Sequence, residues 1–185
     1  MIDELLADIG ERMSKTVKNT SHELAVIRTG KASPALLDNI RVECWGEVLP
    51  LKQVAGISAP EPRLLVVQPW DQSTAEAVAR SIDKSDLGLR ANLDGPIIRI
   101  PIPKLSEERR KELTRHVRKL AEEGRTGVRN LRREANDSLK KACKEGTISE
   151  DREKRALDEV QKLHDSAIAE IDAILASKES EITEV

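Results

Sequence analysis

Residues 106–146 read SEERRKELTRHVRKLAEEGRTGVRNLRREANDSLKKACKEG and form the longest regular pattern in the chain. Ser106 followed by two glutamates is typical of a helix start, because a hydroxyl caps free backbone N–H groups and acids favour the positive end of the helix dipole. Gly146 is typical of a helix end. At 1.5 Å per residue, the pattern predicts a helix about 60 Å long. Its apolar stripe consists of Leu113, Val117, Leu120, Val128, Leu131, Ala135, Leu139 and Cys143.

Two further segments repeat the helical spacing of apolar residues. The first covers residues 1–29 and is expected to end near Thr29-Gly30. The second begins at Ser149, another hydroxyl followed by two acids, and continues into the C-terminal region. Three helices with one apolar stripe each bury those stripes by packing against one another. Residues 1–29 and 106–185 therefore predict an antiparallel three-helix bundle.

Residues 34–100 lack the helical spacing and are rich in proline. Short runs that alternate in polarity or are wholly apolar predict strands at residues 40–44, 48–49, 64–67 and 96–100. Among them, Ser73-Thr74-Ala75-Glu76 fits a capping box, which predicts a short helix. The predicted fold class is therefore α+β, a three-helix bundle with a small β/α domain of residues 34–100 inserted after its first helix.

Two short hinge linkers, residues 30–33 and 101–105, carry the chain into and out of the inserted domain. Gly30 gives the first linker backbone freedom, and the prolines make the second a stiff, extended connector. Because the chain passes twice between the bundle and the inserted domain, that domain can rotate about a hinge but cannot reorient freely. We therefore expect an elongated molecule with two arms. The predicted hinge residues are Thr29, Gly30, Lys31, Ala32, Ser33, Pro101, Ile102, Pro103, Lys104 and Leu105.

The composition excludes several classes of protein. Of the 185 residues, 38 % are hydrophobic and 35 % are charged, and no run approaches the ~20 apolar residues that span a membrane. Cys44 and Cys143 are too far apart in sequence for a zinc motif or a disulfide framework. Trp45 and Trp70 are too few to bind single strands through stacked rings. The acidic N-terminus is unlike a secretory signal, so we expect a cytoplasmic protein without a membrane partner.

The net charge of −2 conceals an uneven distribution. Residues 106–146 carry 13 basic and 8 acidic side chains, a net charge of +5, whereas residues 147–185 carry 5 and 11, a net charge of −6. Residues 1–30 and 31–105 have net charges of −1 and 0. A basic segment and an acidic segment therefore follow each other in the sequence.

Six arginines of the basic segment fall within a helical sector of about 100°. The apolar stripe is centred roughly 130° away, so we expect these arginines to face solvent with few acids among them. An arginine side chain can form two parallel hydrogen bonds to the oxygens of one phosphate. The alternative is a solubilising face paired with acids of the last helix, but the length of the stripe favours phosphate binding. The stripe consists of Arg115, Arg118, Arg125, Arg129, Arg132 and Arg133.

Gly124, Gly127 and Trp45 each allow two explanations. A glycine inside a helix costs about 1 kcal/mol relative to alanine, so the two glycines indicate close helix packing or close approach of a partner. We favour packing. Trp45-Gly46 is a predicted hairpin turn, and Trp45 either covers the aliphatic core of the small domain or contacts a partner protein.

No catalytic or metal-binding motif is present in the sequence. His22, His116 and His164 lack metal-binding spacing, and there is no phosphate-binding glycine loop or nucleophile elbow. Acids on the predicted helices are interspersed with bases, as on a solvated face. We therefore expect no enzyme activity, no catalytic residue, no metal and no cofactor.

Five segments, in this order, resemble the ribosome recycling factors of bacteria and organelles. They are IRTGKASP at 27–34, SDLGL at 85–89, IRIPIP at 98–103, EERRK at 107–111 and VRNLRREAND at 128–137. The resemblance extends over essentially the whole chain. The family's fold, an L-shaped molecule of a three-helix bundle and a small β/α domain, agrees with the fold predicted above. The chain differs at Cys44-Trp45, where two tyrosines are more usual, and at Thr126-Gly127.

The resemblance implies a translation factor. Such factors bind the large ribosomal subunit after peptide release and, with elongation factor G and GTP hydrolysis by that partner, split the ribosome so that messenger and transfer RNA leave. Because residues 128–137 match a family segment, the resemblance implies that Arg129, Arg132 and Arg133 bind ribosomal RNA. Arg28 matches another basic position of the family, near the joint of the two domains. We expect a monomer. The predicted rRNA-binding residues are Arg129, Arg132, Arg133, Arg125, Arg118 and Arg28.

The alternative function is a helical adaptor or co-chaperone that binds protein. An rRNA-binding protein loses affinity steeply as salt rises, because binding releases phosphate counterions, whereas a hydrophobic adaptor does not. A third hypothesis, an enzyme with an undetected site, requires nucleotide turnover by the isolated chain, which we do not expect.

Overall fold

The computed structural model describes residues 1–184 and divides them into two compact units. The first unit contains Met1–Arg28 and Glu108–Glu184, and the second contains Thr29–Glu107. The chain therefore enters and leaves the second unit once each, as expected for an insertion. Both predicted linkers, residues 30–33 and 101–105, fall inside the second unit.

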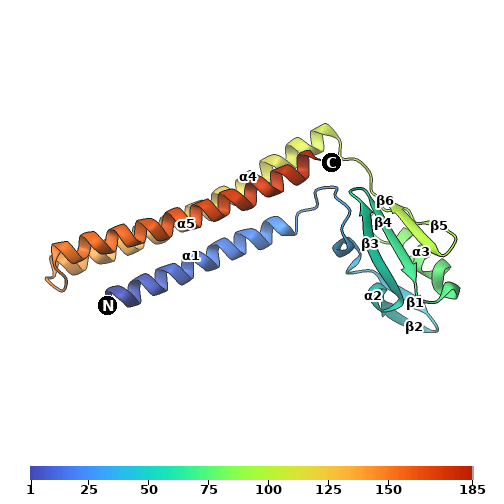
Figure 1. Ribbon diagram of the computed structural model, residues 1–185, viewed down its shortest axis with the longest axis horizontal. Coiled ribbons are helices and arrows are strands. Elements are labelled where there is room, and N and C mark those ends of the chain that lie inside the picture. Colours follow the sequence, from blue (N-terminus) through green and yellow to red (C-terminus); the bar gives the residue numbers. More distant parts are fainter. Residues whose placement is uncertain (185) are drawn as a thin grey trace. The chain divides into compact units, whose positions relative to one another are not determined.

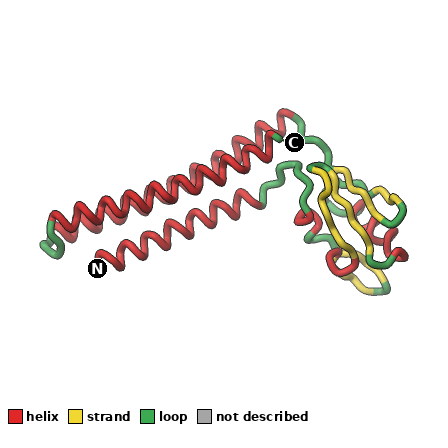
Figure 2. Tube along the Cα trace, in the orientation of Figure 1, coloured by secondary structure: helices red, strands yellow, loops and turns green. Residues whose placement is uncertain are grey.

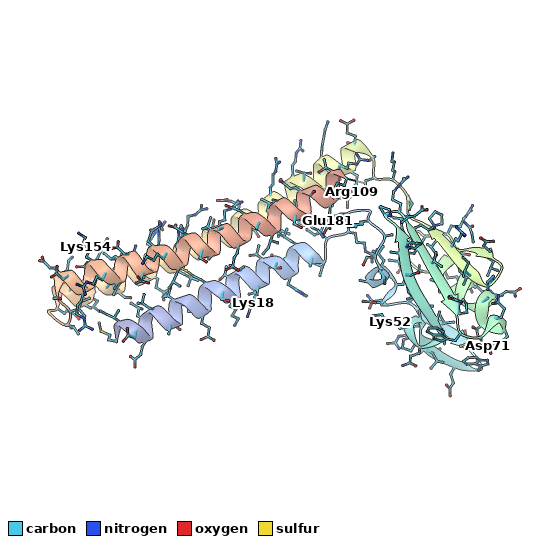
Figure 3. The ribbon with its side chains drawn as sticks, in the orientation of Figure 1. Lys18, Lys52, Asp71, Arg109, Lys154 and Glu181 are labelled. Carbon is cyan, nitrogen blue, oxygen red and sulfur yellow. The ribbon has the colours of Figure 1, made fainter. Side chains whose placement is uncertain are left out.

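The first unit is the predicted bundle, formed by α1 (Ile2–Ala25), α4 (Glu107–Lys144) and α5 (Glu150–Thr183). Helix α4 runs opposite to α1 and α5 (Figure 1). Arg109 and Glu181 accordingly lie at one end of the bundle, and Lys154 lies at the other (Figure 3). The apolar stripes meet in one core, whose buried members include Ile9, Met13, Val128, Leu139, Val160 and Ile171.

Helix α1 ends at Ala25, earlier than the expected end near Thr29. The Val26 N–H still donates to the carbonyl oxygen of His22 at 3.2 Å, but the Ile27 N–H donates to that of Leu24 at 3.3 Å. The second bond has the tighter spacing of a 3₁₀ turn. Val26 and Ile27 are both β-branched and lose side-chain freedom in a helix, which favours an end at this point.

The turn between α4 and α5 follows the predicted signals. Gly146 has φ +72°, which suits glycine, and the Thr147 N–H reaches back to the carbonyl oxygen of Ala142 at 2.9 Å. The Ser149 hydroxyl then accepts a bond from the Arg152 N–H at 3.4 Å and caps α5. These local bonds reverse the chain and hold α4 beside α5.

Close packing explains the two glycines of α4. A Cβ atom at Gly124 would meet the side chain of Thr20, whose Cγ2 lies 3.1 Å from that position, and a Cβ at Gly127 would lie 3.2 Å from the Cγ2 of Thr16. Thr20 is buried, with 4 % of its surface exposed. The packing explanation is therefore confirmed, since α1 packs against α4 where these glycines lie.

The second unit contains a hairpin and a four-stranded antiparallel sheet (Figure 2). The hairpin pairs β1 (Arg41–Cys44) with β2 (Glu47–Pro50). The sheet has the order β3-β4-β6-β5 and consists of β3 (Ala55–Glu61), β4 (Leu64–Pro69), β6 (Ile97–Pro101) and β5 (Asn92–Asp94). The helical elements are α2 (Leu51–Val54), α3 (Ala75–Asp83) and 3₁₀ turns at Pro34–Leu37 and Gln72–Thr74.

One face of the sheet supplies the core of the second unit. Alternate residues of β4 and β6 are fully buried there, packed in one cluster with α3 and with the segment that precedes β1. The sequence predicted these two strands as short apolar runs, and the structure shows that their residues are buried with a period of two. The central residues are Leu65, Val67, Ile98, Ile100, Val78, Ile82 and Leu37.

The capping box predicted at Ser73 is wrong. The Asp71 carboxylate, labelled in Figure 3, accepts bonds from the Ser73 N–H at 3.0 Å and the Ser73 hydroxyl at 2.8 Å, so Ser73 is held in a 3₁₀ turn. These bonds lower the pKa of Asp71. Helix α3 begins later, at Ala75, and Thr74 precedes it without a side-chain cap.

Trp45 does not cover the core of the second unit. It lies at the tip of the β1–β2 hairpin with 65 % of its surface exposed. Trp45 and Gly46 have φ +53° and +76°, the positive values of a type I′ turn. The turn prediction is thus confirmed, and the core explanation for Trp45 is wrong.

Candidate nucleic-acid interface

Helix α4 presents the arginine stripe as one continuous feature, because the helix is unbroken from Glu107 to Lys144. The apolar residues of α4 are buried against α1 and α5, and Arg115, Arg118 and Arg133 are exposed. Arg125, Arg129 and Arg132 are half-buried. The stripe therefore lies at the surface of the bundle, but its members differ in their surroundings.

Two arginines of the stripe are bound by acids of α5. The Arg118 Nε donates to the Oε1 of Glu179 at 2.5 Å, and the Arg125 Nη2 lies 2.6 Å from the Oδ1 of Asp172. The two arginines are seven residues apart on α4, and their acid partners are seven residues apart on α5 in the opposite order. This spacing is expected for two antiparallel helices that pack side by side. These arginines thus fit the alternative that the sequence left open, a charged face paired with the acidic last helix.

Glu122 occupies the middle of the stripe. Its Oε2 accepts a bond from the Arg125 Nη1 at 3.0 Å, and its Oε1 accepts one from the Arg129 Nη2. These two bonds, the Arg129 bond foremost, lower the pKa of Glu122, so the carboxylate stays charged. The expectation that the stripe arginines face solvent with few acids among them is wrong for Arg129, which is half-buried and bonded to Glu122. Glu122 is three residues before Arg125 and seven before Arg129, a spacing that the sequence itself contains.

Arg132 has a different partner, a neutral amide. Its Nη1 donates to the Oε1 of Gln161 on α5 at 3.2 Å. The Gln161 Nε2 donates in turn to the Oδ1 of Asp165 at 2.8 Å, and the Nδ1 of His164 lies 2.8 Å from the same oxygen. The His164 and Gln161 contacts lower the pKa of Asp165. No sequence pattern predicts this network, because it depends on the register between two helices.

Three predicted binding residues make no side-chain hydrogen bond or ion pair among the residues that the structure describes: Arg115, Arg133 and Arg28. Arg133 and Arg115 are exposed on α4, where their guanidinium groups can meet an anion. Arg28 is also exposed, but it follows the end of α1 and does not belong to the α4 stripe.

One residue of each predicted hinge linker is bonded to the β3–β4 turn. The Ala32 N–H donates to the carbonyl oxygen of Pro62 at 2.7 Å, and the Ile102 N–H donates to that of Arg63 at 2.8 Å. Ala32 and Ile102 are each only 7 % exposed. Both linkers are therefore tied at their centres to the second unit.

The remaining hinge residues vary in burial. Gly30 has φ +77°, and a Cβ at this position would lie 2.9 Å from the Cγ of Leu105. Thr29 is 5 % exposed. Lys31, Pro101, Pro103 and Lys104 are exposed, and Ser33 is half-buried with its hydroxyl accepting from the Ala35 N–H at 3.3 Å.

Within residues 1–184, no group of His, Cys, Asp and Glu side chains is arranged to hold a metal ion. His22 and His116 are exposed on α1 and α4, and His164 faces Asp165. In the same range, no helix has the length and apolar character needed to cross a membrane.

Comparison with protein families gives a match over most of the chain. The family model for ribosome recycling factor matches residues 20–183. A ribosome-recycling factor of Symbiobacterium thermophilum is 50 % identical over 185 residues, and one of Syntrophomonas wolfei is 49 % identical over the same length. Each alignment covers 100 % of both chains.

Solved structures give the same result for the fold. A solution structure of a ribosome recycling factor superimposes with a TM-score of 0.72 at 40 % identity, covering 100 % of this chain and 98 % of the other. A second, with a TM-score of 0.64 at 49 % identity and 98 % coverage of both chains, comes from models of the T. thermophilus ribosome recycling factor and the E. coli elongation factor G bound to the E. coli post-termination complex.

Proposed function

Because this chain belongs to the ribosome recycling factor family, we propose that it binds the large ribosomal subunit after termination and, with elongation factor G, splits the post-termination ribosome. Messenger and transfer RNA are then released. The observation that carries this proposal is the match to named recycling factors along the full 185 residues. A related factor has been described on the post-termination complex together with elongation factor G, which supports the same two partners here.

The α4 stripe is the surface that binds ribosomal RNA. Arg133 is exposed and keeps an uncompensated charge for phosphate. Arg132 is bonded to a neutral amide, so among the described residues a phosphate need not displace an ion pair of Arg132. Arg129 can exchange the exposed Glu122 carboxylate for a phosphate. Arg118 and Arg125 are bound to acids of α5, so each must give up an ion pair to bind phosphate, and Arg28 adds a further basic group beyond α1.

The chain itself does no chemistry in this role. GTP hydrolysis belongs to elongation factor G, and the isolated chain has no phosphate loop in its sequence. It acts as a monomer in the cytoplasm, where it meets ribosomes. Incubation of the isolated protein with GTP or ATP is expected to release no phosphate.

Movement of the second unit relative to the bundle accompanies splitting. The linkers at 30–33 and 101–105 are bonded to the β3–β4 turn, so they move with the second unit. The rotation is therefore concentrated where the chain passes between units, at residues 28–29 and 107–108. A disulfide engineered across these crossings is expected to abolish splitting and spare subunit binding, and full activity of the oxidised protein would contradict the hinge.

Co-sedimentation with large ribosomal subunits across a salt series tests the binding role. Arg132→Ala is expected to weaken binding by about 1–3 kcal/mol and to lower the slope of log affinity against log salt by about one unit. Arg152→Ala, at the exposed start of α5, is the control and should bind normally. Binding that is insensitive to salt would favour a protein-binding adaptor instead.

A further inference from the structure

Arg132 differs from the other partnered arginines of the stripe in the charge of its partner. Arg118, Arg125 and Arg129 all donate to carboxylates, which compensate their positive charge. Arg132 donates to the amide oxygen of Gln161, which carries no net charge. Its side chain is thereby restrained without an ion pair among residues 1–184, and the nearby Asp165 carboxylate is close enough for Arg132 to help lower its pKa.

The amide of Gln161 is itself held in one orientation. Its Nε2 donates to the Oδ1 of Asp165 at 2.8 Å, and a carboxylate can only accept, so the amide nitrogen must face Asp165. The Oε1 then faces α4, where the Arg132 Nη1 donates to it at 3.2 Å. The Nδ1 of His164 lies 2.8 Å from the same Oδ1 of Asp165.

We infer that Gln161 is a positioning residue for ribosomal RNA binding, which holds the Arg132 guanidinium in place for a phosphate without neutralising it. This inference rests on the proposed function of the stripe. A guanidinium has five N–H donors, and the bond to Gln161 uses one of them. An arginine fixed before binding loses less side-chain freedom when it meets its phosphate.

The surroundings of Gln161 fit a positioning role better than a structural one. The residue is exposed on α5 and takes no part in the apolar core of the bundle. Its bonds are polar and lie at the surface, where each contributes little to folding. Its loss should therefore alter the arginine that it restrains and leave the stability of the bundle nearly unchanged.

The experiment measures binding of the full chain to isolated large ribosomal subunits by co-sedimentation across a salt series, together with the melting temperature. Gln161→Ala is expected to weaken binding about 3–10-fold, the range for one net hydrogen bond, with an unchanged melting temperature. In an Arg132→Ala background the same change should have no further effect, because there is no arginine left to position. Gln53→Ala, an exposed glutamine of α2, is the matched control and should bind as the parent does.

Gln161→Glu separates positioning from neutralisation. Glutamate keeps an acceptor for Arg132 but compensates its charge, so binding should weaken and the salt slope should fall by about one unit. If Arg132→Ala weakens binding while Gln161→Ala does not, or if the two losses simply add, the positioning role is wrong and the stripe proposal stands. If Arg132→Ala binds normally, the role of the stripe itself is overturned.

Discussion

Thr20 of α1 lies directly against the backbone of Gly124 in α4, with its Cγ2 and Cβ atoms 3.1 and 3.2 Å from where a Cβ on that glycine would lie. Its hydroxyl donates to the carbonyl oxygen of Thr16 at 3.0 Å, which fixes the side chain in this position. The glycine therefore sets how closely α1 can approach the helix that carries the arginine stripe.

Gly124→Ala is expected to destabilise the bundle. The new methyl group overlaps Thr20, and overpacking of this kind costs about 1–3 kcal/mol, against a gain in helix propensity of about 1 kcal/mol. We expect a net loss of up to about 2 kcal/mol, measured by thermal and denaturant unfolding. Gly127→Ala is the matched control, because its Cβ would meet only the Cγ2 of Thr16, at 3.2 Å, so a smaller shift makes room and its loss of stability should be smaller than that of Gly124→Ala.

Combining Gly124→Ala with Thr20→Ala tests the contact itself. Thr20→Ala removes the hydroxyl and the Cγ2 methyl that stand in the way, so the double variant should be more stable than the sum of the two single losses predicts. Strict additivity would mean that Gly124 is required for a reason other than Thr20.

The helices of the bundle could be predicted from the sequence because their signals are local. Ser149 and Gly146 mark the ends of helices through bonds to residues at most five positions away. Strand β3 could not be predicted in this way, since Gly56, Ser58 and Pro60 favour strands weakly and the segment is extended only because β4 pairs with it.

The same distinction applies to the candidate interface. The stripe on α4 could be predicted because the arginines share one helical face. The bonds from Arg132 to Gln161 and from Arg125 to Asp172 join two helices, and their register depends on packing. Glu122 is a different case, because it is close to the arginines in sequence. A helical-wheel projection that included the acidic residues would have placed it in the stripe.

Trp45→Asn is expected to stabilise the second unit. Trp45 has φ +53°, a left-handed conformation that costs most residues about 1–2 kcal/mol, whereas asparagine tolerates it and is favoured before Gly46 in a type I′ turn. Because 65 % of Trp45 is exposed, little apolar burial is lost. Thermal unfolding should show a gain of up to about 1 kcal/mol. A clear loss would show that the indole supports the hairpin, and slower ribosome splitting by a stable variant would indicate a partner contact.

Arg12→Ala is expected to remove a pH-dependent contribution to stability. Arg12 donates to Glu134 through Nη1 at 2.7 Å and Nη2 at 2.9 Å, and this pairing holds the pKa of Glu134 below its ordinary value of 4.5. A carboxylate whose pKa is lower in the folded state stabilises the protein above the unfolded pKa, and this stability is lost as the pH falls through the folded value. At pH 7 the melting temperature should fall by about 1–4 °C.

The difference between Arg12→Ala and the parent should shrink below pH 4.5, as Glu134 takes up a proton in both proteins. Lys18→Ala, an exposed lysine of α1 labelled in Figure 3, is the control and should melt as the parent does at every pH. A difference that persists unchanged at pH 3 would show that Arg12 contributes through packing of its aliphatic stem.

Glu122→Gln is expected to strengthen binding to the large ribosomal subunit. The Glu122 carboxylate binds Arg125 at 3.0 Å and also binds Arg129, so an incoming phosphate must compete with it for both guanidinium groups. The amide removes the negative charge and leaves the shape nearly unchanged. Affinity should rise about two- to fivefold, the range that an exposed ion pair allows, with a steeper dependence on salt.

Glu159→Gln is the matched control. Glu159 is equally exposed, is paired with Lys162 on α5 and lies outside the stripe, so the loss of its charge should leave binding unchanged. Weaker binding by Glu122→Gln would mean that this carboxylate orients Arg129 for RNA and does not compete with it.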